Sequence, residues 1–131
     1  MKPYLYSIAL AVTLLLEGCS QAEPEPDFSG IQNIPYTVQQ FSGTTGGAAH
    51  VSIHPNPFFE QLEIYVHNPD RKPATIYISD QKGKYSRKID LLPDGSNNYV
   101  LLDFQHMPKG VYICEVQHPG KADRYRLVKA R

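Results

Sequence analysis

The sequence has no excess of charge of either sign and very little cysteine. Thirteen Lys and Arg residues balance thirteen Asp and Glu residues, which gives a formal net charge of zero over 131 residues. Because no general positive field surrounds the chain, nucleic acid is excluded as an expected partner. Two cysteines cannot form a disulfide-stapled scaffold. The chain is therefore expected to hold one small domain that is stabilised by packing.

Helical periodicity is also missing. Beyond residue 19, no stretch of about eleven residues repeats its apolar side chains at the helical period. Apolar and polar residues alternate instead, as in the runs 62–66 and 75–79, and turn signals rich in Pro, Gly, Asn and Asp separate these runs. This pattern predicts an all-β fold, an Ig-like antiparallel β-sandwich of about seven strands. The expected strands cover 51–53, 62–66, 75–79, 84–91, 98–104, 111–117 and 124–129, with a weaker candidate at 36–41.

The core of such a sandwich comes from the inward faces of both sheets. The residues expected to form it are Val51, Ile53, Leu62, Ile64, Val66, Ile76, Ile78, Ile89, Leu102, Phe104, Val111, Ile113, Val116, Leu127 and Val128. A domain of this size buries little more than about 60% of its unfolded surface, so each large core residue carries a substantial share of its stability.

The first residues are expected to direct export rather than to fold. Lys2 precedes an apolar run at 4–16, which is shorter than the roughly 20 residues of a spanning helix but suits a secretory signal. The following Leu16-Glu17-Gly18-Cys19 resembles the lipobox of bacterial lipoproteins, which implies acylation of Cys19; an ordinary signal peptide with a chance cysteine is the alternative. Two acyl chains would give stable membrane anchoring.

Residues 19–47 are expected to form an acidic and glycine-rich tether. Acid and proline alternate in 20–27 without an apolar period, which is typical of an extended, solvated spacer. The sequence therefore divides into a lipoprotein signal peptide at 1–18, this tether, and a β-sandwich at 48–131.

Four motifs follow in order along the sandwich. They are the run His54-Pro55-Asn56-Pro57-Phe58, the segment from Ala74 through Asp80-Gln81-Lys82-Gly83-Lys84, the step Met107-Pro108-Lys109-Gly110-Val111-Tyr112, and the closing Arg126-Leu127-Val128-Lys129. In this order they resemble the carboxy-terminal sorting domain of the type IX secretion system, found in Bacteroidetes. The resemblance covers about 80 residues and implies an Ig-like sandwich, an outer membrane, and components of that system, or another envelope protein, as partners.

The resemblance marks ten motif residues, namely Pro55, Asn56, Pro57, Phe58, Gly83, Lys84, Pro108, Gly110, Val111 and Tyr112. Physical reasons for several of them are independent of the family, although generic β-sandwich turns would also explain each one singly. Two prolines around Asn56 stiffen the chain so that Phe58 seals one end of the sandwich. Asp80 to Gly83 suits a tight hairpin, since Asp accepts backbone donors and Gly adopts positive φ. Tyr112 is expected to bury its ring while its hydroxyl reaches a turn backbone.

The last segment is basic. Four of its cations, Arg124, Arg126, Lys129 and Arg131, are candidates for a docking stripe. The favoured interpretation is a solvated edge strand whose charges discourage pairing with other strands.

Catalysis and metal binding find little support. His50 and His54 are four residues apart, but the β pattern and Pro55 exclude the helix that would direct both at one metal ion. Cys114 falls inside a strong strand, where an inert buried thiol is favoured. No cofactor, metal or enzymatic activity is expected.

Two functions remain. The preferred one is a non-enzymatic, exported outer-membrane lipoprotein, facing either the periplasm or the cell surface, whose sorting-domain-like module acts in secretion or envelope interactions. Residues 19–47 leave no room for a large cargo ahead of the module. The alternative is a glycan- or peptide-binding β-sandwich lipoprotein in which Tyr65, Tyr77, Tyr85 and Tyr99 form a stacking platform.

Overall fold

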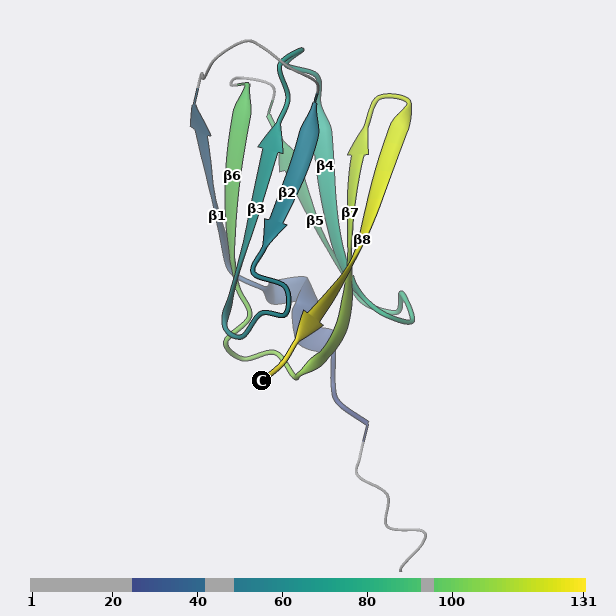
Figure 1. Ribbon diagram of the computed structural model, residues 1–131. Helices are drawn as coiled ribbons and strands as arrows, with labels where there is room; N and C mark the ends of the chain where they lie inside the picture. The colour runs from purple at the N-terminus through teal and green to yellow at the C-terminus, as the bar shows by residue number, and fades with distance from the viewer. Residues whose placement is uncertain (1–24, 42–48, 93–95) are drawn as a thin grey trace, which may run out of the picture.

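A computed structural model describes residues 25–41, 49–92 and 96–131, and these residues form a sandwich of two four-stranded antiparallel sheets (Figure 1). A short 3-10 helix precedes the strands and crosses one end of the sandwich. The elements are η1 (Ser29–Asn33), β1 (Tyr36–Phe41), β2 (His50–His54), β3 (Gln61–His67), β4 (Ala74–Asp80), β5 (Ser86–Leu91), β6 (Asn97–Asp103), β7 (Gly110–His118) and β8 (Lys121–Lys129). The predicted β-sandwich is therefore confirmed, with eight strands in place of about seven.

The chain passes back and forth between the two sheets. One sheet has the order β1-β6-β3-β2 and the other the order β5-β4-β7-β8. Within each sheet every neighbouring pair is antiparallel. The final strand, β8, lies at an edge and pairs along its whole length with β7.

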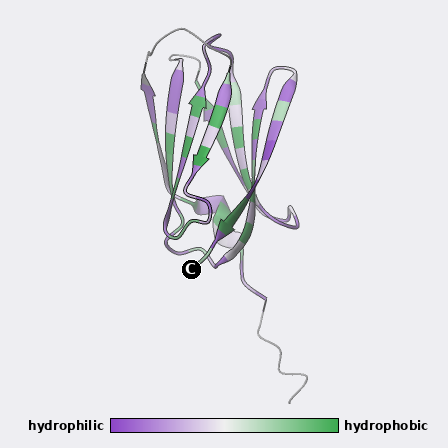
Figure 2. Ribbon diagram, viewed as in Figure 1, coloured by the Kyte–Doolittle hydropathy of each residue, from purple (hydrophilic) through white to green (hydrophobic). Residues whose placement is uncertain are grey.

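Burial alternates along the central strands, as the period of two predicts. Every second side chain is buried in β4, and also in β3 up to Val66, after which His67 is buried too; Figure 2 shows the corresponding alternation of hydrophobic and hydrophilic bands. Ten of the predicted core residues are buried, namely Leu62, Ile64, Val66, Ile76, Ile78, Ile89, Leu102, Phe104, Val116 and Leu127. The core is one continuous cluster of side chains contributed by both sheets.

Three predicted core residues were placed wrongly: Val111, Ile113 and Val128 are only partly buried and do not belong to the core cluster, whereas Val51 and Ile53 are partly buried but pack against it. In β7 the inward side chains are instead Tyr112, Cys114 and Val116. The register with β4 explains this choice of face, because Cys114 pairs with Ile78 and Val116 with Ile76, and both isoleucines point into the core. Val51 and Ile53 pack against the core from β2. Their burial is incomplete because β2 is an edge strand, with β3 as its neighbour on one side only.

The fold begins well before residue 48, which corrects the predicted tether. Ile31 and Ile34 are completely or almost completely buried, and β1 pairs with β6 over its whole length. The backbone N–H of Asp103 donates to the carbonyl of Pro35 at 2.9 Å, which fixes the start of β1 beside the end of β6. The weaker strand candidate at 36–41 is thus confirmed, and residues 28–41 belong to the sandwich.

We predict that Ile64→Ala destabilises the folded chain by about 2 to 5 kcal/mol, because Ile64 is fully buried on a central strand and its truncation leaves a cavity. Ile113→Ala is the matched control. It removes the same atoms from the outer face of β7 and should cost about 1 kcal/mol or less. Urea unfolding followed by circular dichroism measures both changes. Equal losses for the two variants would contradict the assignment of the two faces.

Candidate functional site

The motif residues gather at one end of the sandwich, which we call the motif end. The turn after β2, the β4–β5 hairpin, the segment that leads into β7 and the end of β8 all lie at the lower end in Figure 1. Residues distant in sequence therefore meet there, as the isolated parallel bridge between Phe58 and Lys129 shows. The motif end comprises residues 55–60, 80–85, 104–112 and 126–131.

The Pro-Asn-Pro-Phe turn is fastened to the last strand. The side-chain amide of Asn56 donates to the carbonyl of Arg126 at 3.0 Å, and its oxygen accepts the backbone N–H of Val128 at 3.0 Å. Phe58 adds two backbone hydrogen bonds, donating to Val128 at 2.9 Å and accepting from Ala130 at 2.8 Å. Asn56 thus acts through its side chain as an extra strand partner, a role that the sequence analysis missed.

Phe58 seals the end of the core, as predicted. Its side chain is fully buried and packs against Phe104, with ring centroids 4.8 Å apart, and against Tyr112 at 6.2 Å. Phe104 and Tyr112 meet edge to face at 5.1 Å. The Tyr112 hydroxyl donates to the carbonyl of Pro108, which confirms the predicted contact with a turn backbone. Burial raises the pKa of Tyr112 well above its ordinary value.

The β4–β5 hairpin also has its predicted geometry. The Asp80 carboxylate accepts the backbone N–H of Tyr85 at 2.8 Å, and the Asp80 carbonyl accepts that of Gly83 at 3.0 Å. Gly83 has φ of 71°, a value that a side chain would disfavour. Lys84 follows with its amine 5.3 Å from the centroid of the Tyr85 ring. The hairpin therefore presents Lys84 on a rigid turn.

A groove of about 610 Å³ lies between this hairpin, residues 109–111 and the upstream residues 25–28, and we call it the hairpin groove. Gly83 lies beside it on the hairpin, and Lys84, Gly110 and Val111 line it, so two of the predicted motifs border one hollow. Gly110 has φ of 147°, again in the range that favours glycine. Val111 is partly exposed there.

The predicted docking stripe is divided by the fold. Arg124 and Arg126 are exposed on β8, which is the edge strand that the favoured interpretation expects. Lys129 is only 5% exposed and belongs to the sealed end rather than to the solvent face. Arg131 lies over the exposed ring of Phe59, 5.3 Å from its centroid. The four cations therefore do not form one surface.

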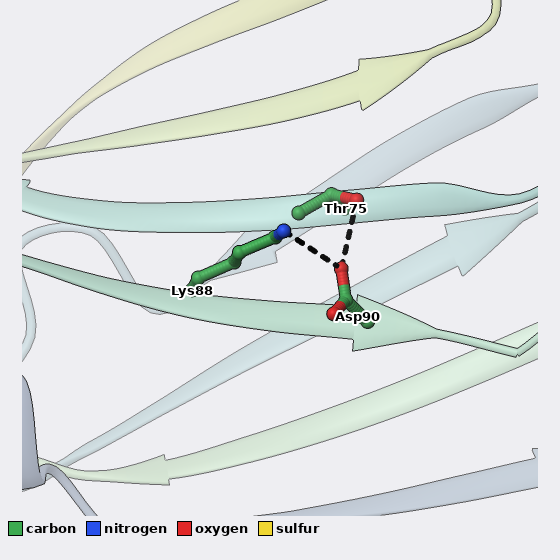
Figure 3. A network of polar contacts seen from close by, with 3 residues as sticks. All are labelled: Thr75, Lys88 and Asp90. Atoms are coloured by element: carbon green, nitrogen blue, oxygen red, sulfur yellow. Dashed lines mark hydrogen bonds and ion pairs between the residues drawn. The ribbon is translucent and has the colours of Figure 1, made fainter.

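The four candidate tyrosines do not share one platform. Tyr65 and Tyr99 are neighbours on the outer face of the β1-β6-β3-β2 sheet, whereas Tyr77 lies on the opposite sheet and Tyr85 on the hairpin. Beside Tyr77, the carboxylate of Asp90 accepts a hydrogen bond from Thr75 at 3.1 Å and lies 3.8 Å from the Lys88 amine (Figure 3). The Thr75–Asp90 contact crosses from β4 to β5, and the Lys88–Asp90 ion pair lies within β5; both are exposed contacts of ordinary surface type.

Groups able to carry chemistry are scarce in the described part of the chain. Cys114 is fully buried, and burial raises the pKa of its thiol to about 12, so the thiolate is suppressed at neutral pH. His54 lies 3.1 Å from Glu63 at the surface. Among residues 25–41, 49–92 and 96–131, no three His, Cys, Asp or Glu side chains are grouped to hold a metal ion.

Within these ranges no helix has the length and apolar character needed to cross a bilayer. The proposed acylation site, Cys19, lies outside the described residues.

Comparison with known proteins identifies the family of the module. The profile of the family described as secretion system C-terminal sorting domain matches residues 52–130. No curated protein and no solved structure gives a significant match. The match begins in β2, includes all ten motif residues, and ends at residue 130. The chain therefore belongs to the family of type IX secretion C-terminal sorting domains, as its motifs indicated.

Proposed function

We propose that residues 52–130 serve as a sorting module that type IX secretion components recognise at the motif end, and that the chain is not an enzyme. The observation that carries this proposal is the family match over these residues together with the convergence of the separate motifs at one end of the sandwich. A sorting role requires a distinctive surface and no reactive group.

The exposed motif residues are the ones that a partner can contact. Pro55, Asn56, Pro57 and Lys84 are exposed, whereas Phe58 and Tyr112 are fully buried and act by shaping the end. Recognition is therefore proposed to involve the turn after β2 and the β4–β5 hairpin. Their backbone conformations are fixed by Asn56 and by Asp80, so little conformational entropy is lost when a partner binds.

A lipid anchor at Cys19 is the second part of the proposal. It rests on the lipobox-like Leu16-Glu17-Gly18-Cys19 sequence after the apolar run. An anchored chain would hold the module at the outer membrane, on its periplasmic or its outer side. Two acyl chains supply enough buried methylene groups for lasting attachment.

A ligand-binding role has narrower support. Only Tyr65 and Tyr99 stand side by side, and the hydroxyl of Tyr65 donates to Asn97 at 2.6 Å. A hydrogen bond with Glu63 raises the pKa of Tyr99. The pairing of Tyr65 with Tyr99 reduces the proposed stacking platform from four rings to two, and a glycan- or peptide-binding role on these two rings is the alternative function.

The sorting role predicts transport of a reporter. Residues 25–131, which include the whole described sandwich, are fused behind a signal peptide and a reporter in a host with an intact type IX system. We expect the reporter at the cell surface, measured by protease accessibility on intact cells. Retention in the periplasm of a fusion that resists proteolysis as a folded domain would refute the sorting role.

Two charge reversals sharpen this experiment. Lys84→Glu changes an exposed motif residue, and Lys88→Glu changes an exposed cation on the outer face of β5. We expect Lys84→Glu to lower the surface fraction and Lys88→Glu to leave it unchanged. Equal surface fractions for both variants would argue that Lys84 is not part of the recognised surface.

The anchor predicts incorporation of labelled palmitate. Wild-type chain expressed with radiolabelled palmitate should carry the label and partition with membranes, because acylation of Cys19 places hydrocarbon in the bilayer. Cys19→Ala should lose both properties. Cys114→Ala is the control, since that thiol is buried. Label that persists in Cys19→Ala would contradict the assignment.

A further inference from the structure

Residues 25–28 lie against the motif end although they fall outside the matched family region 52–130. They form one wall of the hairpin groove, whose other walls come from the β4–β5 hairpin and residues 109–111. The chain thus brings an upstream segment of its own to a surface built from two of the motifs.

Phe28 is the apolar contact of this segment. Its ring meets Tyr112 edge to face with centroids 5.4 Å apart, and it packs against the core while remaining partly exposed. A Cβ atom at Gly110 would come within 3.2 Å of the Phe28 ring. The absence of a side chain at position 110 therefore makes room for the aromatic ring, and Gly110 and Tyr112 together form a socket for it.

Residues of opposite charge face each other across the groove beside this socket. Lys82, Lys84 and Lys109 line the groove, and the segment opposite them carries Glu25 and Asp27. The Lys82 amine lies 3.8 Å from the Glu25 carboxylate. Hydrogen bonds from Ser29, with a smaller contribution from the charge of Lys84, hold the pKa of Asp27 below its ordinary value. All of these charged groups are exposed, so each attraction is weak and sensitive to salt.

We propose that the surface formed by the β4–β5 hairpin and residues 109–112 binds an acidic peptide segment of a partner protein in which an aromatic residue follows the acidic ones, and that residues 25–28, which form one wall of the hairpin groove, cover this surface as an intramolecular competitor. The three lysines select the acidic residues and the Gly110–Tyr112 socket selects the ring. The segment is anchored downstream by the buried Ile31, whereas residues 25–27 are exposed. Release of residues 25–28 breaks their exposed charge contacts, the contact of Phe28 with Tyr112 and the hydrogen bond from the Ile31 N–H to the Phe28 carbonyl, but it leaves the pairing of β1 with β6 in place.

The proposal deepens the proposed function and rests on it, because the groove is bordered by motifs that the secretion components are proposed to read. In the occupied state, residues 25–28 cover part of that surface. A partner segment with the same acid-proline-acid-aromatic chemistry would take their place.

The test uses a fluorescein-labelled peptide with the sequence of residues 24–30, titrated by fluorescence anisotropy with the full chain and its variants. We expect Phe28→Ala to bind the peptide roughly tenfold or more tightly than wild type, because the competitor has lost its ring and the fraction of open groove rises. A peptide with Ala in place of Phe should not bind. Equal binding by wild type and Phe28→Ala would overturn the proposal.

Further variants separate the groove from the fold. Because Phe28 touches the core, the double variant Glu25→Lys with Asp27→Lys provides a second way to weaken the competitor through exposed residues alone, and it should also bind the peptide more tightly than wild type. Adding Lys84→Glu and Lys109→Glu to Phe28→Ala should abolish binding, whereas adding Lys88→Glu should not. Binding that survives the groove reversals would refute the site.

This experiment does not depend on export. If the reporter fusion stays in the periplasm while the peptide binds as expected, the sorting role fails and the groove stands. If export proceeds but no variant binds the peptide, the groove proposal alone fails.

Discussion

The fold depends on one closure, the attachment of the Pro-Asn-Pro-Phe turn to the final strand. A two-sheet sandwich is open at its ends, and an open end exposes core side chains to water. Here Phe58 fills that end, and four hydrogen bonds from Asn56 and Phe58 hold it against β8 and the residue that follows. The edge strand β8 of one sheet is thereby hydrogen-bonded to the turn that follows β2 of the other sheet. The two sheets are joined through backbone groups as well as through the apolar core.

The same closure explains why the motifs, though distant in sequence, belong together. Phe58 contacts Phe104 and Tyr112, and Tyr112 in turn supports Phe28. Each ring meets a neighbour edge to face or at a tilt, which is the favoured geometry for aromatic pairs. The upstream segment, the turn after β2, the start of β7 and the end of β8 are therefore positioned by one aromatic cluster. Because Gly110 has no side chain, Phe28 of the upstream segment can pack against Tyr112 in this cluster.

Much of the architecture was predictable because alternation is a local signal. Leu62, Ile64 and Val66 alternate with polar residues, and this pattern specifies both the strand and its buried face. The run 111–116 could not be assigned in this way, since apolar side chains occupy both faces and only the register with Ile76 and Ile78 decides between them. Residues 28–35 were missed, and the strand at 36–41 was only a weaker candidate, for a related reason. The strand is set by pairing with β6. Of the two buried isoleucines that precede it, Ile31 lies in a helix too short to show a period, and Ile34 follows that helix directly.

In the candidate site, too, the sequence predicts the roles of some residues and not those of others. The roles of Phe58, Asp80 and Tyr112 follow from the chemistry of single residues, so the sequence was sufficient for them. The burial of Lys129 and the double hydrogen bond of Asn56 depend on where β8 passes, which no local pattern specifies. Phe58 and Tyr112, which fill the end, are buried, whereas Pro55, Asn56, Pro57 and Lys84 are exposed to a partner. A motif of this kind encodes both the packing of the end and the surface that the packing displays. Loss of a buried member would change every exposed position around it, whereas loss of an exposed member such as Lys84 would remove one contact and leave the others in place.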